Sequence, residues 1–294
     1  MTGNLQYYLI RMISRIVCLL PYPLICRMGR VVGYIFYRIA KRQRQRGIEQ
    51  AMRGLELSHQ EAEQIVRRLF YNLGQTLMEV MYMPALSSEK IGKYISIEGL
   101  DNLRLALQSG KGVVFLTAHI GNWEWMGAAL SHAGFPMTTI AKPQPNVHFT
   151  RILNEYRAMV GLEVFHSGTT DLVKAAKALK QGKVLGFLAD EDGGSNGVFV
   201  DFLGKKASTP IGPAIFAKRF GATIVPAFTF HRPGGGHRVV IGQPFAYEKH
   251  SDPDEELYQN TARMTKFIEE AIKANPEDWL WFRKRWNTPY KVQE

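Results

Sequence analysis

Two short apolar runs constrain the fold of this chain more than any other feature of its sequence. They read VVFLTA over Val113–Ala118 and VLGFLA over Val184–Ala189, and neither contains a charged residue. A continuous apolar run of this length is typical of a strand that is buried on both faces, as in a parallel sheet. Because parallel strands must be joined by crossovers, which are usually helices, the two runs predict an α/β fold.

The rest of the chain alternates between helix and strand patterns in the same way. Helices are expected over residues 58–84, 101–108, 122–132, 149–160, 170–181, 210–220 and 254–274. Further strands are expected over residues 94–97, 137–142, 162–165, 198–203, 222–228 and 237–242. We therefore predict one α/β domain over residues 55–294, with a largely parallel central sheet flanked by helices, and an N-terminal helical appendage over residues 1–54.

The positive charge of the chain is concentrated in this appendage. Residues 1–53 contain ten Lys or Arg and one acidic residue, Glu49, which gives +9 of the total net charge of +11. The other 241 residues contain 27 basic and 25 acidic side chains, which gives +2. A nucleic-acid-binding domain more often spreads a basic face through its fold, so we expect no nucleic-acid partner.

Large apolar residues alternate with the N-terminal cations, a pattern that favours an anionic membrane surface as the partner of residues 1–53. Within residues 1–53, the longest stretch without a charged residue, Ile16–Cys26, has 11 residues, whereas a spanning helix needs about 20 apolar residues. We therefore interpret the segment as a membrane-surface anchor. Two alternatives stay open: a helical hairpin packed on the core with a solvated basic face, and a tilted single span that starts near Leu5.

The clearest candidate for catalysis is the segment TAHIGNWEWMG, residues 117–127. His119 follows the first buried run, at the carboxyl end of a strand, where open α/β sheets bind their ligands. Glu124 lies in the first turn of the next helix, and we expect its carboxylate to reach back and orient the imidazole. The other ring nitrogen could then act as a general base. The alternative is a capping histidine followed by a glutamate that interacts favourably with the helix dipole.

Four segments in the same order resemble a known family. They read HIGNWEW, AKPQPNVHFTRILNEYRAMVG, LADEDGGSNGVFVDFLGKKASTP and NPEDWLWFRKRWN. HIGNWE is similar to the H-x4-D/E motif of the glycerolipid acyltransferase superfamily, and the rest of the chain resembles its lipid A biosynthesis (lauroyl/myristoyl) acyltransferases.

This resemblance implies a reaction. His119, oriented by Glu124, would deprotonate a hydroxyl of a lipid A precursor, and that oxygen would attack the thioester of an acyl carrier protein. It implies no metal, cofactor or covalent acyl-enzyme. It also implies a place on the cytoplasmic face of the inner membrane, monotopic or single-pass. Another glycolipid or phospholipid acceptor, or an acyl-coenzyme A donor, remains open.

The resemblance also suggests residues that bind substrate. Arg157 would hold the acceptor phosphate or stabilise the developing oxyanion, unless it only forms a salt bridge with Glu155 or Asp171. Asp190, which follows the second buried run, is expected as a site carboxylate that orders Arg157. The other candidates for substrate binding are Asn122, Lys142, Thr209 and Arg283.

Two other classes of function deserve comparison. Gly193–Gly197 fits the G-x-S-x-G elbow of a membrane-bound serine hydrolase with Ser195 as nucleophile, but the residues that follow look extended rather than helical, so we predict a polar turn. A non-catalytic protein that binds anionic lipid or nucleic acid through residues 1–53 is the other alternative. Residues 233–237 are expected to form a hairpin turn, and the remaining histidines show no metal-ligand spacing.

Overall fold

The computed structural model describes residues 2–142, 144–166 and 168–290. Its centre is a seven-stranded sheet in the order β1-β9-β8-β2-β5-β3-β4. The strands are β1 (Ile95–Glu98), β2 (Val113–Thr117), β3 (Met137–Ala141), β4 (Glu163–His166), β5 (Val184–Leu188), β8 (Thr223–His231) and β9 (His237–Ile241). Neighbouring strands run parallel, apart from the antiparallel pair of β8 and β9.

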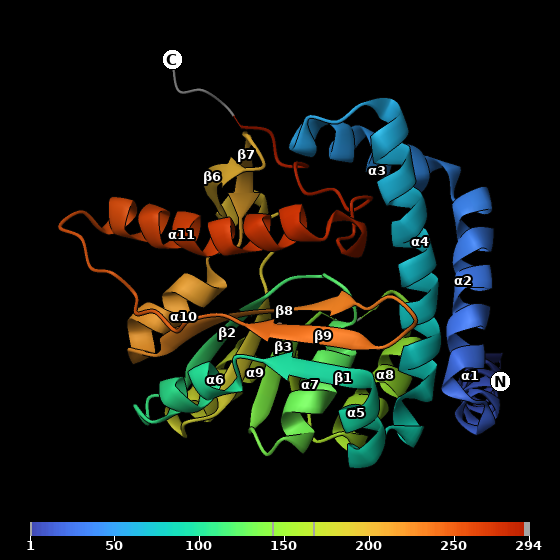
Figure 1. The fold of residues 1–294 in the computed structure, drawn as a ribbon. Coiled ribbons are helices and arrows are strands. Elements are labelled where there is room, and N and C mark those ends of the chain that lie inside the picture. The colour runs from blue at the N-terminus through green and yellow to red at the C-terminus, as the bar shows by residue number, and fades with distance from the viewer. Residues whose placement is uncertain (1, 143, 167, 291–294) are drawn as a thin grey trace.

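Helices cover the sheet and extend to one side of it (Figure 1). The N-terminal helices are α1 (Thr2–Leu19), α2 (Tyr22–Ile39), α3 (Lys41–Leu55) and α4 (His59–Tyr82). The helices of the body are α5 (Ser88–Tyr94), α6 (Leu100–Leu107), α7 (Trp123–His132), α8 (Val147–Met159), α9 (Thr169–Lys180), α10 (Gly212–Phe220) and α11 (Pro253–Ala274). The predicted α/β class and the largely parallel sheet are confirmed.

The two apolar runs occupy the middle of the sheet, as their composition requires. All five residues of β2 are buried, and Val113 pairs with Val184 of β5 in parallel register. Since both strands run in the same direction, their carboxyl ends lie side by side. The register therefore brings the residues after Thr117 next to those after Leu188.

One expected strand lies outside this sheet. β6 (Val198–Phe202) pairs antiparallel with β7 (Lys205–Thr209), which the sequence pattern does not predict. The two residues between them, Leu203 and Gly204, have positive φ angles of 49° and 72°. This backbone conformation gives a tight hairpin turn, so the chain returns on itself outside the central sheet, where β6 packs against α11.

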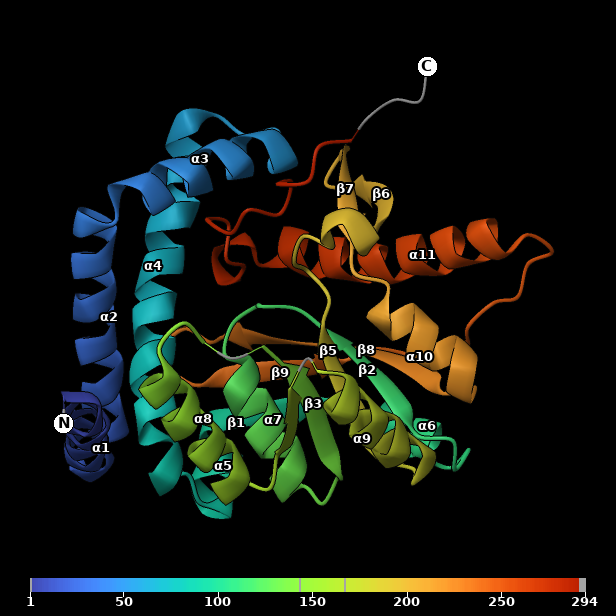
Figure 2. The ribbon, with the colours of Figure 1, turned by 180° about the vertical axis from the view of Figure 1, so that it is seen from behind.

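The helices α1, α2 and α3 pack against α4 (Figures 1 and 2). α2 lies beside α4 so closely that a Cβ atom on Gly33 would be 2.2 Å from the carbonyl oxygen of Phe70, and one on Gly74 would be 2.2 Å from that of Gly29. These glycines permit a backbone-to-backbone helix contact.

The outer faces of α1 and α2 carry many exposed apolar side chains. They are Leu5, Tyr8, Leu9, Met12, Ile13, Ile16, Leu19, Leu24, Met28, Val31, Tyr34, Ile35 and Ile39. Within the described residues, none of the helices combines the length and the apolar character that crossing a bilayer requires. Membrane association of the appendage stays a prediction.

Candidate active site

His119 and Asp190 meet where β2 and β5 end. The main-chain N–H of Ala189 donates to the carbonyl of Thr117 over 3.0 Å and holds the two strand ends together. Asp190 Oδ1 accepts from the main-chain N–H of His119 over 3.1 Å and lies 2.9 Å from its Nδ1. Asp190, which follows β5, thus orients the imidazole of His119, which follows the neighbouring strand β2.

Asp190 is buried and ionised. Its second oxygen, Oδ2, accepts a hydrogen bond of 2.8 Å from Trp279 Nε1. Burial acts to raise the pKa of Asp190, but His119 and the hydrogen bonds to the carboxylate outweigh it and hold the pKa well below its usual range. Because the carboxylate can only accept, the Nδ1 of His119 is the donor, and in the neutral ring Nε2 carries the free lone pair.

Glu124 has a different partner. Arg157 of α8 binds it with two hydrogen bonds, from Nε to Oε2 over 2.8 Å and from Nη2 to Oε1 over 2.5 Å. The structure therefore differs from the expected pairing on both counts: Asp190, not Glu124, contacts the His119 ring, and Glu124, not Asp190, orders Arg157. The reason is topological, because parallel pairing of β2 and β5 places Asp190 beside the imidazole.

The Glu124–Arg157 pair is a buried ion pair. Burial acts to lower the pKa of Arg157, but the charge and hydrogen bonds of Glu124 prevail and raise it above the usual value. Trp123 Nε1 also donates to Glu124 over 3.0 Å. The alternative expectation, a salt bridge of Arg157 with Glu155 or Asp171, is not what the structure shows.

A cavity of about 450 Å³ opens in front of His119. Its polar lining includes His119, Glu124, Lys142, Arg157, Glu191 and Arg283, and its apolar lining includes Leu77, Val80, Phe149, Leu153 and Phe187. A smaller, mostly apolar cavity of about 60 Å³ shares Glu124 and Arg157 with it and continues toward Met126 and Leu162. A cavity with one charged and one apolar wall suits an amphiphile.

Glu191 neutralises the cations at the cavity mouth. Its Oε2 lies 3.5 Å from Lys142 Nζ, and its Oε1 pairs with Arg283 Nη1. Oε1 also lies 3.9 Å from the free Nε2 of His119. Lys142 and Arg283 are thus brought to the cavity, as expected, and Glu191 is a site residue that sequence reasoning did not assign.

Asn122 and Thr209 do not line either cavity. Asn122 is fully buried, caps α7 by accepting from the main-chain N–H of Trp125, and donates to Glu79 over 2.7 Å. Thr209 Oγ1 is buried and accepts from Arg285 over 2.6 Å. Both side chains support the surrounding structure in this way, and their role in substrate binding stays a prediction. Pro210, next to Thr209, does line the larger cavity.

A buried cluster behind the site escaped sequence reasoning. Glu79 of α4 accepts from Tyr22 and Gln75 on Oε1, and from Asn122 and His237 on Oε2, over 2.7–2.8 Å. Burial acts to raise the pKa of Glu79, but the charge and hydrogen bond of His237 help to hold it at about 2. The carboxylate therefore links α2 to the turn between β2 and α7, which carries His119 and Asn122.

Two histidines of this cluster are cross-strand partners. His231 and His237 face each other across the β8–β9 hairpin, whose turn lies where the sequence predicts it. With Glu79 they place possible metal-ligand atoms within 4.8 Å of one another. Because the Glu79 oxygens already accept four hydrogen bonds and His231 Nδ1 lies 2.6 Å from Asp278 Oδ1, we assign a hydrogen-bond network. The sequence offers one signal for this pair, which is that the two histidines stand at equal distances on either side of the predicted turn.

Ser195 lacks the setting of a hydrolase nucleophile. It is exposed in the short 3₁₀ turn Gly194–Asn196, and strand β6 follows. A nucleophile elbow needs a helix at that point. The predicted polar turn is confirmed.

Comparison with known proteins identifies the class of this enzyme as an acyltransferase. The lipid A biosynthesis lauroyltransferase of Escherichia coli K12 is 27% identical over 277 residues, covering 92% of this chain and 87% of that protein. A phosphatidylinositol mannoside acyltransferase of Mycolicibacterium smegmatis is 26% identical, covering 76% and 73%. A family model for bacterial lipid A biosynthesis acyltransferases matches residues 1–288, so the chain belongs to that family.

The similar solved structures include the 1-acyl-sn-glycerophosphate acyltransferase of Thermotoga maritima. It is 16% identical, with a TM-score of 0.40, over 84% of this chain and 97% of that one.

Proposed function

We propose that this acyltransferase moves a fatty acyl group from acyl carrier protein to a hydroxyl of a lipid A precursor. The observation that carries the proposal is the His119–Asp190 pair, whose free Nε2 faces a cavity with charged and apolar walls. The family membership and the relatives named for lipid A biosynthesis support the choice of acceptor. A related glycolipid is the second candidate acceptor, because another relative is named for phosphatidylinositol mannoside.

The proposed reaction needs one base and no covalent enzyme intermediate. His119 Nε2 takes the proton of the acceptor hydroxyl while its oxygen attacks the thioester carbonyl. The tetrahedral intermediate collapses, the carbon–sulfur bond breaks, and the imidazolium returns its proton to the leaving thiolate. Asp190 stabilises the imidazolium between these two transfers, because it is ionised and bonded to Nδ1.

Arg157 and Glu124 serve the same reaction as a fixed pair. Two hydrogen bonds hold the guanidinium at the cavity wall. There it can stabilise the oxyanion of the intermediate or hold an acceptor phosphate. Glu124 acts by positioning Arg157, while Lys142 and Arg283 supply further cations at the mouth. The apolar wall and the smaller cavity accommodate the acyl chain.

We place the enzyme on the cytoplasmic face of the inner membrane as a monotopic protein. The supporting observation is the array of exposed apolar side chains on α1 and α2, which is larger than water-facing helices normally leave uncovered. Exposed Arg15, Arg27 and Arg38 on the same helices suit anionic headgroups.

Mass spectrometry of membrane lipids tests the proposed function. Cells that lack the protein should accumulate a lipid A precursor short of one acyl chain, and the wild-type chain should restore it. The His119→Ala chain should not restore it. A missing chain in another glycolipid would favour the second acceptor, and an unchanged lipid profile would contradict both. Supplying purified enzyme with acyl carrier protein or coenzyme A thioesters then identifies the donor.

A further inference from the structure

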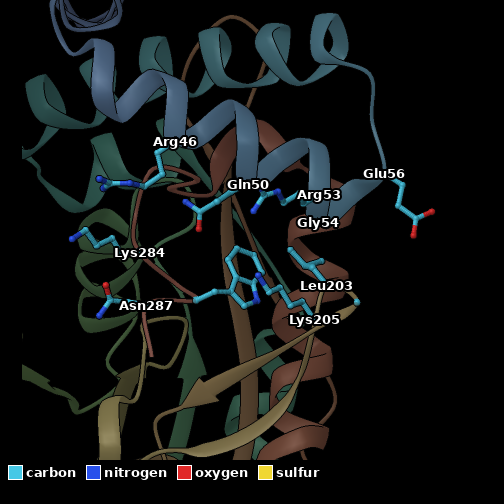
Figure 3. A pocket seen from close by; sticks show the side chains of 11 residues that line it. Arg46, Gln50, Arg53, Gly54, Glu56, Leu203, Lys205, Lys284 and Asn287 are labelled. Carbon is cyan, nitrogen blue, oxygen red and sulfur yellow. The ribbon is translucent and has the colours of Figure 1, made fainter. Parts of the chain in front are cut away.

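A second, strongly basic pocket lies outside the catalytic cavity. It measures about 500 Å³ and is enclosed by α3, the turn between β6 and β7, and the C-terminal segment around Trp286. Figure 3 shows the side chains that line the pocket from these three elements, its cations among them. They are Arg46, Arg53, Lys205 and Lys284, against a single acidic lining residue, Glu56.

These cations are available to a partner. Among the described residues, Arg53, Lys205 and Lys284 have no carboxylate within ion-pair distance, and Arg46 donates only to the carbonyl of Phe282. In contrast, the Lys and Arg side chains at the catalytic cavity are paired with Glu191 or Glu124. Trp286 adds a buried Nε1 donor that has no partner within the part of the chain that the structure describes. The pocket thus presents unbalanced positive charge.

Residues 283–285 lie between the basic pocket and the catalytic cavity. Arg283 lines the catalytic cavity and Lys284 the basic pocket, and a shallow depression between them includes both residues. Arg285 holds residues 283–285 against β7, because its buried guanidinium donates to the carbonyl of Ser208 and to Thr209 Oγ1. A ligand bound in the pocket could therefore extend an arm toward His119.

We infer that this pocket docks the acyl carrier protein, an acidic protein that presents its thioester on a phosphopantetheine arm. The inference rests on the proposed function and adds where the donor binds. Charge complementarity favours an acidic partner. The pocket lies at the end of α3 remote from α1 and α2, whose exposed apolar faces we assign to the membrane, so a soluble partner suits it better than a lipid (Figure 1).

Charge reversal tests this docking site. In the double variant Arg53→Glu with Lys205→Glu, binding of labelled holo acyl carrier protein and the KM for its acyl form should weaken at least about tenfold, because rim charges govern such encounters. The kcat and the KM for the acceptor should stay within about twofold of wild type. The matched control, Lys249→Glu with Lys273→Glu, makes the same charge change at exposed sites elsewhere and should leave carrier binding unchanged.

Two results would overturn the inference. One is an equal loss of carrier binding in the pocket variant and the control, which would show a general charge effect. The other is loss of binding to phosphatidylglycerol vesicles with an unchanged carrier KM, which would make the pocket a lipid site. Failure of the proposed function is distinguishable, because the wild-type enzyme itself would then transfer no acyl group from the carrier.

Discussion

At the scale of single residues, the sequence identifies most members of the site but not their partners. His119, Glu124 and Asp190 are found because they follow buried strands or open a helix. Their pairing depends on which strands are neighbours, and Asp190 is 71 residues from His119 in the chain. Glu79 offers no local signal at all, since a single acidic residue in an amphipathic helix is ordinarily solvated.

Different effects are expected from replacing the two buried carboxylates, one mainly on kcat and one mainly on stability. Asp190→Asn should lower kcat by about 10²–10⁴, because the imidazole loses its orienting anion, while the KM for the acceptor stays near wild type. Glu124→Gln should instead lower the free energy of unfolding, by about 3–5 kcal/mol, because it leaves the Arg157 charge buried without a counter-ion. Steady-state kinetics and urea denaturation of both variants measure this. If a stably folded Glu124→Gln enzyme lost more of its kcat than Asp190→Asn, Glu124 rather than Asp190 would orient the imidazole.

Glu79 should make stability depend on pH. Its pKa is about 2 in the folded protein and about 4.3 in an unfolded chain. The unfolded state therefore binds the proton more readily, and the stabilisation is complete above about pH 5 and is lost as the pH falls toward 2. Glu79→Gln should have a lower free energy of unfolding than wild type at neutral pH, and this difference should narrow as the pH falls. Chemical denaturation across this range, with exposed Glu270→Gln as control, would contradict the assignment if the difference stayed constant.

At the scale of elements, the sequence predicts the body of the fold well. Runs such as residues 113–118 have one stable solution, a strand buried on both faces, and the helix patterns between them carry clear caps, such as Ser58 before α4. β7 was missed because its sequence, KKAST, is polar at one end and has no alternation. The close contact of α2 with α4 also escapes prediction. A glycine in a helix ordinarily indicates a lower helix propensity, not a site where a second helix packs closely.

The stability of a Gly33→Ala variant therefore tests the packing of α2 on α4, because the two possibilities predict changes of opposite sign. Alanine in place of a helical glycine normally stabilises by up to about 1 kcal/mol. Gly33→Ala should destabilise the protein instead, because its Cβ would lie 2.2 Å from the carbonyl oxygen of Phe70. Gly92→Ala is the matched control in helix α5, where a Cβ meets nothing within 4 Å. Thermal denaturation of both variants measures this; a stabilised Gly33→Ala protein would show that the two helices are less tightly packed.

At the scale of the whole molecule, the asymmetry of charge and apolar surface indicates how the enzyme is oriented. Exposed apolar residues gather on α1 and α2, while the basic pocket lies at the far end of α3. The sequence shows the charge bias of residues 1–53, but which of these side chains face outward follows only from the packing on α4. If both proposals hold, the enzyme meets its lipid and its carrier on different surfaces.

Vesicle binding tests the orientation. Replacing Leu9, Ile16 and Ile35 by serine should weaken binding to vesicles that contain phosphatidylglycerol at least about tenfold, because each exposed apolar side chain loses its burial in the interface. The same replacement of Leu172, Val173 and Ile215, exposed on the body, is the control. Vesicle sedimentation would contradict the orientation if both sets weakened binding equally.

The most direct test of the central claim is the rate of acyl transfer by His119→Ala. Since a general base contributes about 10²–10⁴, the variant should retain less than about a hundredth of the wild-type rate, while Ser195→Ala stays within about twofold of it. A folded His119→Ala enzyme that keeps more than this fraction, or a Ser195→Ala enzyme that loses its activity, would contradict catalysis by the imidazole.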